Sequence, residues 1–218
     1  MEGVLGQRGA VTGILRINAP RVAVLMALAP ILAKLAWNHP RLTVEVHTND
    51  AFVDIIEQRF DAGIRLGDSI QQDMVSVRLT PPFKAIMVAA PEYLTARGEP
   101  QSIAGLAHHN CIGFRMLGAG ALYEWDLRAA DQDISVNVNG TAVLTDASFA
   151  RDFALTGIGI AYIFEPLVRK DLREGRLRWV LPEAFIEEQG LFLYFPRRAA
   201  LAPKLRAFID VARGVLRE

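Results

Sequence analysis

The 218-residue sequence lacks the features that mark several familiar protein classes. Its single cysteine, Cys111, excludes an internal disulfide and fits a reducing compartment. Its longest apolar stretch, Val22 to Leu35, contains Pro30 and Lys34 and is shorter than the roughly 18 apolar residues of a membrane span. The opening residues, MEGVLGQRGA, have no apolar core of signal-peptide type. We therefore expect a cytoplasmic protein without a membrane partner.

The sequence also has no excess of charge of either sign. Lys plus Arg equals Asp plus Glu at 24 each, whereas a domain that binds nucleic acid by itself is usually basic or carries a basic stripe. A modest basic excess at 169–178 is interpreted as a solvated helix end and turn. Hydrophobic residues make up 51% of the chain, enough for a folded core.

The residues that usually carry catalysis or bind metals are sparse and unsuitably spaced. His108, His109 and Cys111 enter a predicted strand, where alternate side chains point to opposite faces, and no second ligand pair with zinc-site spacing follows. None of the five serines lies in a Gly-x-Ser-x-Gly elbow, and the glycines at 118–120 and 157–159 lack a phosphate-loop pattern. We therefore expect no metal, no cofactor and no enzymatic activity, with a small α/β enzyme kept as a third hypothesis.

Strands and helices alternate in the first third of the chain. Strands are predicted at 14–17, 42–47 and 60–65. A long helix is predicted at 22–38, where Pro30 should kink it or start a fresh helix. A second helix, capped by Asn49 or Asp50, should precede the third strand. This alternation favours a mainly parallel sheet covered by helices.

The pattern repeats after a crossing near Pro81-Pro82, between predicted strands at 75–79 and 85–89. Helices are expected near 91–97 and 102–108, a strand at 111–114 and a hairpin over 123–138. Thr145 or Asp146 should cap a helix whose residues Phe149, Phe153 and Thr156 share one face, and Gly157 should end it.

The last third of the chain adds strands and helices to both predicted subdomains. A strand is predicted at 159–163, a short helix near 166–173, and strands near 176–180 and 191–195. The final helix begins at Pro203 and presents an apolar stripe that needs the first sheet as its partner. The fold class is therefore α/β, with two Rossmann-like subdomains joined by two crossing strands. The expected limits are 1–13 for a linker, 14–84 with 191–218 for subdomain I, and 85–190 for subdomain II.

Several segments, in order, carry a resemblance to a known family. They are TAVLTDASFARDFALTGIGIAYIFEP at 141–166, GILRI at 13–17, FDAGIR at 60–65, LAHHNCI at 106–112, and FPRR at 195–198 followed by PKLRAFI at 203–209. Together they resemble the effector-binding domain of LysR-type transcriptional regulators over nearly the whole chain. The resemblance implies a periplasmic-binding-protein-like (type 2) fold with a small-molecule pocket between lobes. It also implies that promoter DNA is bound only through an N-terminal winged helix-turn-helix, for which there is no room before Ile14.

Ligands of open α/β sheets bind beyond the carboxyl ends of the strands. Arg21, Arg65 or Arg115 can meet a carboxylate there, and Phe114 or Phe164 can cover a ring. The alternatives to ligand binding are ion pairs for the arginines, core packing for the two rings, and helix capping by Thr48 and Asp146. The candidate effector-binding residues are Pro20, Arg21, Thr48, Asn49, Arg65, Leu66, Asp68, Phe114, Arg115, Thr145, Asp146, Ala147 and Phe164.

Two of these positions bear on the class of ligand. The family often has a small hydroxyl residue where this sequence reads Pro20-Arg21-Val22, so a different ligand class is indicated. Asp68 would oppose a dianion.

The sequence thus predicts the ligand-sensing domain of a LysR-type regulator, which binds a small organic effector of anionic or aromatic character. The alternative is a free-standing solute-binding protein of the same fold. A homodimer or homotetramer is expected, with helix 22–38 and the sheet edge at 42–47 as pairing surfaces. Leu28 and Ile31 are proposed to contact the second subunit, with core packing against the sheet as the alternative.

Overall fold

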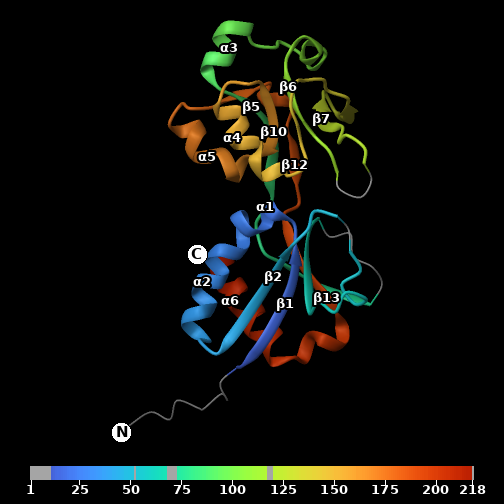
Figure 1. The fold of residues 1–218 in the computed structure, drawn as a ribbon, viewed down its shortest axis with the longest axis vertical. Coiled ribbons are helices and arrows are strands. Elements are labelled where there is room, and N and C mark those ends of the chain that lie inside the picture. The colour runs from blue at the N-terminus through green and yellow to red at the C-terminus, as the bar shows by residue number, and fades with distance from the viewer. Residues whose placement is uncertain (1–10, 52, 68–72, 117–119, 218) are drawn as a thin grey trace. The chain divides into compact units, whose positions relative to one another are not determined.

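The computed structural model describes residues 11–51, 53–67, 73–116 and 120–217. The chain divides into two compact units. The first contains the residues up to Pro81 together with those from Gly190 onward, and the second is Pro82–Gln189. Each unit has its own sheet with helices packed against it (Figure 1).

The first unit, as far as it is described, contains a five-stranded mixed sheet. β1 pairs in parallel with β2 and β3, and β13 pairs antiparallel with β3 and β4. Leu15 and Ile17 of β1 are fully buried, because one face of the sheet packs against helices. The strands, in sheet order, are β2 (Leu42–Thr48), β1 (Gly13–Ala19), β3 (Ala62–Leu66), β13 (Leu191–Pro196) and β4 (Met74–Arg78).

The predicted long helix forms, and Pro30 starts a fresh segment of it. The helix runs as α1 (Arg21–Ala23), a π-helical segment (Val24–Leu28) and α2 (Ala29–Asn38). Pro30 has no N–H to donate, and the N–H of Ala29 reaches back five residues to the carbonyl of Val24. The wider turn before the proline lets the helix continue without the missing bond.

By length and composition alone, Arg21–Asn38 is apolar enough to cross a membrane. Its inner face instead forms part of the core of the first unit. Leu28 and Ile31, proposed as subunit contacts, are 0% and 1% exposed, so that assignment was wrong and the core alternative holds. The π-helical segment shifts the register of the helix faces, which the simple 3.6-residue pattern did not take into account. Leu25 and Trp37, which are 59% and 88% exposed, are the large apolar side chains on the outer face.

The predicted C-terminal helix is confirmed as α6 (Pro203–Leu216). Its predicted stripe residues Leu205, Phe208, Ile209 and Ala212 are buried. The helix packs beside α2 and against β1 in the first unit (Figure 1). The Lys204 ammonium at its start donates to Asp61 Oδ2 and to the Ile14 carbonyl, both at 2.7 Å, which ties the helix to the sheet.

The predicted helix after Asn49 is wrong. Residues 55–59 form turns, in which Asp54 Oδ1 accepts from the amides of Ile56 and Glu57 at 2.8 and 3.1 Å. Arg59 then adopts a left-handed conformation with φ 59°, which stops helical propagation. Asp54 thus starts a single turn, which the Phe60 N–H closes by donating to the Ile55 carbonyl at 2.8 Å.

The two chain segments that connect the units touch within the first unit. The Leu79 N–H donates to the Leu191 carbonyl at 2.8 Å, and the Leu191 N–H donates to Thr80 Oγ1 at 2.9 Å. Gly190 has φ +111°, and a Cβ there would lie 2.8 Å from the Thr80 carbonyl oxygen. This close approach of two backbones requires glycine.

The second unit is built on a mixed sheet in which β10 is parallel to β6 and antiparallel to β5. Its strands, in sheet order, are β11 (Arg178–Val180), β5 (Phe83–Ala89), β10 (Ile160–Phe164), β6 (Cys111–Phe114) and β9 (Val143–Leu144), with β12 (Ile186–Glu188) also paired to β5. The helices are α3 (Pro91–Arg97), α4 (Ala150–Leu155) and α5 (Glu165–Arg173), with short 3₁₀ segments at 103–108, 147–149 and 182–184.

The predicted hairpin is confirmed as β7 (Trp125–Ala129) and β8 (Gln132–Val136). Trp125 and Leu127 alternate inward and are 1% and 0% exposed, so one face of the hairpin covers the sheet core of this unit. The outer face is polar, as the alternation of the sequence indicated.

Asn110 joins three segments at the start of β6. Its Nδ2 donates to Thr141 Oγ1 and to the Ile158 carbonyl, and its Oδ1 accepts from the Thr141 amide. A Cβ on Gly159 would lie 2.0 Å from the Asn110 carbonyl oxygen, so glycine is needed for this contact. The Asn-Cys pair of the LAHHNCI segment is therefore structural.

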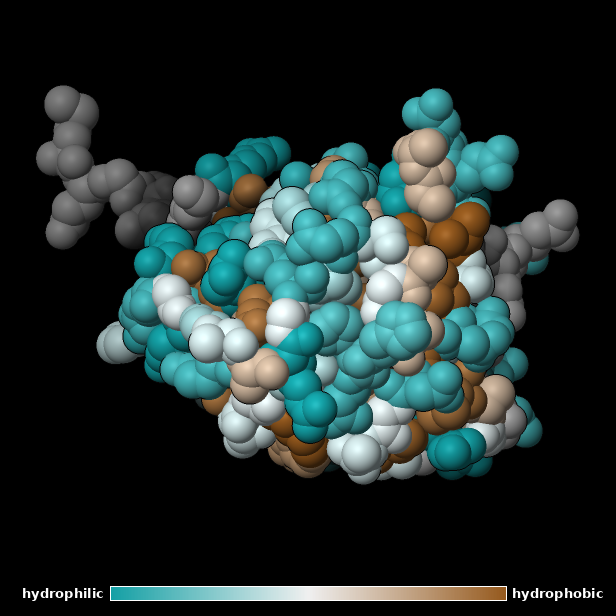
Figure 2. All heavy atoms as spheres, turned by 90° about the horizontal axis from the view of Figure 1, so that it is seen from above, coloured by the Kyte–Doolittle hydropathy of each residue, from teal (hydrophilic) through white to brown (hydrophobic). Residues whose placement is uncertain are grey.

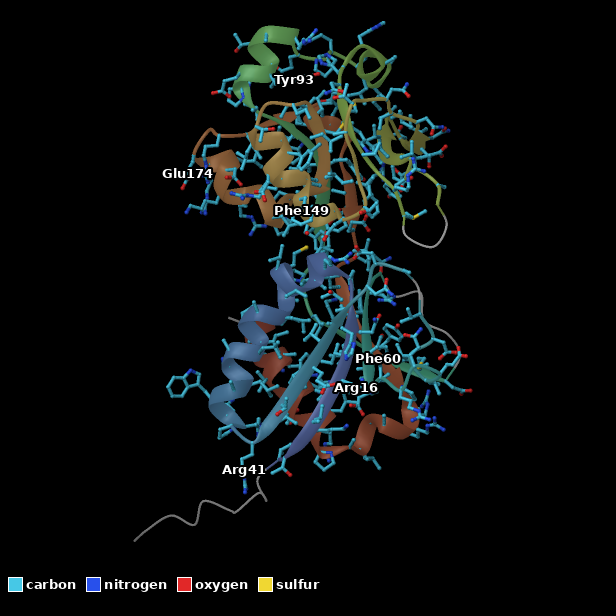
Figure 3. All side chains as sticks on the ribbon, viewed as in Figure 1. Arg16, Arg41, Phe60, Tyr93, Phe149 and Glu174 are labelled. Atoms are coloured by element: carbon cyan, nitrogen blue, oxygen red, sulfur yellow. The ribbon has the colours of Figure 1, made fainter. Side chains whose placement is uncertain are left out.

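Two alanines form the buried face of α4. Ala150 and Ala154 face the core at 7% and 0% exposure, whereas Phe149 (labelled in Figure 3) and Phe153 are 53% and 37% exposed. Small residues at a four-residue spacing let the helix approach β10 closely. The face predicted to carry Phe149 and Phe153 is therefore the more exposed one.

Asp171 is a fully buried carboxylate that holds α4, α5 and the following turn together. Its oxygens accept from Arg151 Nε and Nη2 at 2.6 and 2.8 Å, and from Arg176 Nη2 at 2.6 Å. Its residue exposure is 0%, so the carboxylate depends on these partners for its solvation.

We expect Asp171→Ala to reduce the free energy of unfolding by about 3–5 kcal/mol, because it leaves two guanidinium groups without their buried partner. Denaturant unfolding followed by circular dichroism measures this change. Asp152→Ala is the matched control, since Asp152 pairs with the same Arg151 at 3.1 Å but is 65% exposed at its side chain. Its expected cost is below about 1 kcal/mol. Equal costs for the two variants would contradict the structural role of Asp171.

Candidate functional site

The first unit brings together the candidate residues that follow its parallel strands. β1, β2 and β3 end at Ala19, Thr48 and Leu66, and Ala19 lies opposite Thr48 in the register. Since these strands run in the same direction, their carboxyl ends share one edge of the sheet. Of the residues predicted for this edge, the structure describes Pro20, Arg21, Thr48, Asn49, Arg65 and Leu66, and Asp68 lies outside the described residues.

Asp50, predicted from the sequence only as a possible cap of a second helix, instead occupies the start of helix 21–38. Its Oδ1 accepts from the Arg21 amide and its Oδ2 from Arg21 Nη1, each at 3.0 Å. A carboxylate at this position meets the positive end of the helix as well as a guanidinium. The ion-pair alternative for Arg21 therefore holds. Sequence patterns gave no indication of it because the two residues are 29 positions apart.

Arg65 is held in a largely buried polar cluster at the same edge. Its Nη2 donates to Asn18 Oδ1 at 3.0 Å and to the Ala51 carbonyl at 3.3 Å. Burial lowers the pKa of the Arg65 guanidinium, while Tyr194 and Asp50 act in the opposite direction. A guanidinium stays charged under such a shift, so this edge keeps a fixed cation.

Tyr194 of β13 lies over Gly63 and beneath this guanidinium. The Arg65 Cζ is 5.7 Å from the ring centroid, and a Cβ on Gly63 would lie 2.3 Å from the ring. The absence of a side chain at Gly63 thus makes room for the ring. The Tyr194 hydroxyl is buried and has no hydrogen-bond partner within the described ranges, which marks a polar position that packing alone does not satisfy.

The second unit likewise gathers its candidates at one sheet edge. β6, β9 and β10 are linked by parallel pairing and end at Phe114, Leu144 and Phe164. The candidates that end or follow these strands are Phe114, Arg115, Thr145, Asp146, Ala147 and Phe164. Each group of candidates thus lies at one sheet edge of its own unit, and the role of both groups in ligand binding stays a prediction.

Of the two predicted caps, Thr145 and Asp146, it is Asp146 that caps the 3₁₀ turn leading into α4. Its Oδ1 accepts from the Ser148 amide at 3.0 Å and from the Ser148 hydroxyl at 2.6 Å. Thr145 is exposed and Ala147 opens the 3₁₀ turn that precedes α4. The Asp146 carboxylate thus satisfies the Ser148 amide at the start of this helix.

The remaining candidates of this unit have neighbours of their own. Arg115 is exposed, and its Nη1 donates to the Gly120 carbonyl at 2.6 Å. Phe114 packs edge-on with Tyr123 at 6.5 Å, and Phe164 packs edge-on with Phe83 at 5.0 Å. Both rings are only partly buried, so packing occupies part of their surface and leaves the rest accessible.

The histidines and the cysteine have structural surroundings. His109 Nδ1 lies 3.2 Å from the hydroxyl of Tyr93 (labelled in Figure 3) on α3, and burial lowers the pKa of His109. Cys111 is 1% exposed, and burial raises its pKa to about 12, which makes it an unreactive thiol. Throughout the described parts of the chain, no three His, Cys, Asp or Glu side chains are placed to hold a metal ion.

A groove of about 930 Å³ lies elsewhere in the first unit, between the end of α2 and α6. None of the candidate residues lines it. Its polar lining residues are Lys34, Asn38, His39, Arg206 and Asp210.

The chain is similar to part of several bacterial proteins that are named as regulators. A family model described as "LysR substrate binding domain" matches residues 8–217. A Pseudomonas aeruginosa protein named as a transcriptional regulator is 37% identical over 202 residues, and the HTH-type regulator YcaN of Escherichia coli is 35% identical over 202. In both cases the match covers 93% of this chain and 66% of the relative, slightly less than two thirds.

Among solved structures, the regulatory domain of CrgA from Neisseria meningitidis superposes with a TM-score of 0.81 at 26% identity. The match covers 94% of this chain and 100% of that domain, whose protein is named as a LysR-type transcriptional regulator. The expected α/β fold of periplasmic-binding-protein type is thereby confirmed. Because the named relatives are transcriptional regulators, the alternative of a free-standing solute-binding protein is not supported.

Removing the Asp50 carboxylate should convert the start of helix 21–38 into a position that accepts an external anion. We expect sodium sulfate to raise the melting temperature of Asp50→Ala by more than that of the unsubstituted chain, with sodium chloride at equal ionic strength as the reference. The reason is that helix amides and Arg21 favour an anion, and binding to the native state alone stabilises it. Differential scanning fluorimetry measures the shift.

Asp54→Ala is the matched control, since it removes a nearby carboxylate that caps a turn away from the helix. Equal sulfate effects in Asp50→Ala, Asp54→Ala and the unsubstituted chain would contradict the assignment.

Proposed function

The chain belongs to the LysR substrate-binding domain family, and on that premise we propose that it is the effector-sensing part of a longer, DNA-binding transcriptional regulator of the bacterial cytoplasm. The regulator names of the relatives support this proposal, as does the fraction of their length that the chain covers. In this proposal promoter DNA contacts other parts of the whole protein, and the chain acts by binding a ligand rather than by catalysis. The equal numbers of basic and acidic residues agree with that division of roles.

The observation that carries the proposal is the gathering of polar groups at the carboxyl edge of the parallel strands in the first unit. Arg65 is fixed there by Asn18 and the Ala51 carbonyl, beside the buried Tyr194 hydroxyl. A preorganised guanidinium with planar donors suits recognition of a carboxylate or another planar acceptor. We propose that the effector is a small organic molecule that engages Arg65. In the second unit, we propose contacts with the strand ends at Phe114, Arg115, Thr145, Ala147 and Phe164.

Coupling of binding to regulation needs a difference in free energy between two states of the whole protein. A ligand shifts such an equilibrium only by its different affinity for the two states. We propose that effector binding at the strand ends biases the relation of the two units, and that the whole oligomer transmits this bias to DNA.

We propose a homodimer or homotetramer that uses the outer face of helix 21–38 together with strand β2. Trp37 is 88% exposed and Leu25 is 59% exposed, although both are large apolar side chains. β2 lies at the edge of its sheet, where unpaired backbone groups are available to a second chain. Figure 2 shows hydrophobic side chains interspersed with hydrophilic ones on the face that it presents.

A ligand screen tests the sensing function. We expect at least one member of a panel of small carboxylates, aromatic acids and amino acids to raise the melting temperature of the chain, because only the native state binds. Arg65→Lys should weaken that ligand by about ten-fold or more, since lysine keeps the charge but loses the planar fork. Isothermal titration calorimetry measures the dissociation constants.

The exposed Arg41 (labelled in Figure 3) provides the control Arg41→Lys, which should leave the affinity unchanged. A ligand that binds both variants as well as the unsubstituted chain would show that Arg65 is not part of its site.

Substitution of Trp37 tests the pairing surface. We expect Trp37→Ser to weaken self-association by about ten-fold or more, because large aromatic side chains dominate the energies of protein interfaces. Sedimentation velocity over a concentration series measures the change. Leu201→Ser is the control, since Leu201 is 79% exposed but lies outside the proposed surface. Unchanged association of Trp37→Ser would place the interface elsewhere.

A further inference from the structure

The second unit contains a group of aromatic rings and carboxylates around the start of the β7–β8 hairpin. The rings of Tyr123, Tyr162 and Trp125 stack in sequence, with centroids 6.4 Å apart for the first pair and 5.6 Å for the second. Tyr162 comes from β10, while Tyr123 and Trp125 lead into and begin the β7–β8 hairpin. Tyr123 and Tyr162 are only partly buried, in contrast to Trp125 at 1% exposure.

Two carboxylates near these rings, those of Asp126 and Glu188, differ in their hydrogen bonding. The Tyr123 and Ser135 hydroxyls donate to the Asp126 carboxylate, and the Tyr162 hydroxyl donates to the Asp126 carbonyl. Asp126 is thereby satisfied. Glu188, in contrast, makes no hydrogen bond or ion pair with any residue that the structure describes, although it is partly buried.

Strand geometry places Glu188 on the aromatic side of the sheet. Glu188 pairs with Phe83 in the β12–β5 register, and Phe164 pairs with Ala85 in the β10–β5 register. Phe83 and Ala85 share one face of β5, so Glu188 shares that face with Phe164 and with Tyr162, two residues before it. The edge-on contact of Phe83 and Phe164 at 5.0 Å agrees with this placement.

The nearest basic residue along the strands faces the other way. Lys84 is the register partner of Glu187, and its ammonium lies 4.0 Å from the Phe185 ring centroid and 5.5 Å from that of Trp179. Glu187 and Lys84 thus occupy the opposite face of the sheet from Glu188. The aromatic face therefore carries the acidic charges of Asp126 and Glu188.

An unpartnered carboxylate next to aromatic rings has a clear chemical complement. The faces of aromatic rings attract cations, and a partly desolvated carboxylate is stabilised by a positive neighbour. Burial raises the pKa of Glu188, and Asp126 acts in the same direction, so a bound cation would relieve both effects.

We propose that the second unit binds the ammonium group of an organic cation between the Glu188 carboxylate and the ring of Tyr123, which ends the stack and so keeps one face clear of it. This inference rests on the proposed effector-sensing function and names the class of group that this unit recognises.

Choline chloride is the probe, with sodium chloride at equal ionic strength as the reference and 3,3-dimethylbutan-1-ol as the neutral compound of the same shape. We expect choline to raise the melting temperature and to give a measurable dissociation constant by calorimetry. The affinity of the neutral compound should be lower than that of choline by about ten-fold or more, because the neutral compound lacks the charge. Glu188→Gln should lose choline affinity by about ten-fold or more.

Glu187→Gln is the matched control, since it makes the same change of charge one residue away on the opposite face, and its affinity should stay within about two-fold of the unsubstituted chain. Glu188→Gln should also melt at a higher temperature than the unsubstituted chain, because it removes a poorly solvated charge. That increase shows that the variant is folded, and a purely structural role for Glu188 would give the opposite sign.

The proposal is overturned if choline does not bind, if the neutral compound binds equally well, or if Glu188→Gln retains full affinity. A carboxylate that binds with dependence on Arg65, together with no binding of choline, would leave the sensing function intact and reject only this inference. If no compound of any class stabilises the chain, the sensing function itself fails.

Discussion

The parallel pairing of β1 with its two neighbours is the constraint on which the polar site of the first unit depends. Parallel strands must all end at the same edge of a sheet, so Ala19, Thr48 and Leu66 deliver the following residues to one place. The second unit uses the same device with β6, β9 and β10. In each unit the residues that come together are far apart in sequence, and the buried strands between them supply the core that fixes their positions.

The distribution of charge limits which ligand groups each unit can bind. The start of helix 21–38 is occupied by Asp50, so the anion preference of the helix end is already satisfied within the protein. The Arg65 guanidinium provides a fixed positive charge at the same edge, whereas the second unit places the Glu188 carboxylate on the same sheet face as its aromatic rings. The two units therefore differ in chemical character although they share an architecture.

Local patterns in the sequence were sufficient for elements that local physics determines. Alternation predicted the β7–β8 hairpin, and a proline with an apolar stripe predicted α6. Thr145 or Asp146 was predicted as a helix cap, and Asp146 is the cap. The patterns were insufficient where long-range packing decides. Leu28 and Ile31 were assigned to a subunit surface, but a π-helical segment turns them into the core. Phe149 and Phe153 were predicted to share a helix face, but close packing of Ala150 and Ala154 against the sheet decides that this face is not the buried one. Asp50 was predicted only as a local helix cap, and Glu188 was not singled out at all, because the surroundings of both depend on residues distant in the sequence.

The position of β13 in its sheet has a consequence for the order in which the protein is made. β13 lies between β3 and β4, although it follows them by more than a hundred residues along the chain. A ribosome therefore releases the whole of Pro82–Gln189, which is contiguous, before it releases the strand that fills the gap in the first sheet. The second unit can complete its hydrogen bonding during synthesis, whereas β3 and β4 must wait with open edges. Nascent chains that stall before Leu191 would expose those edges to one another and to chaperones.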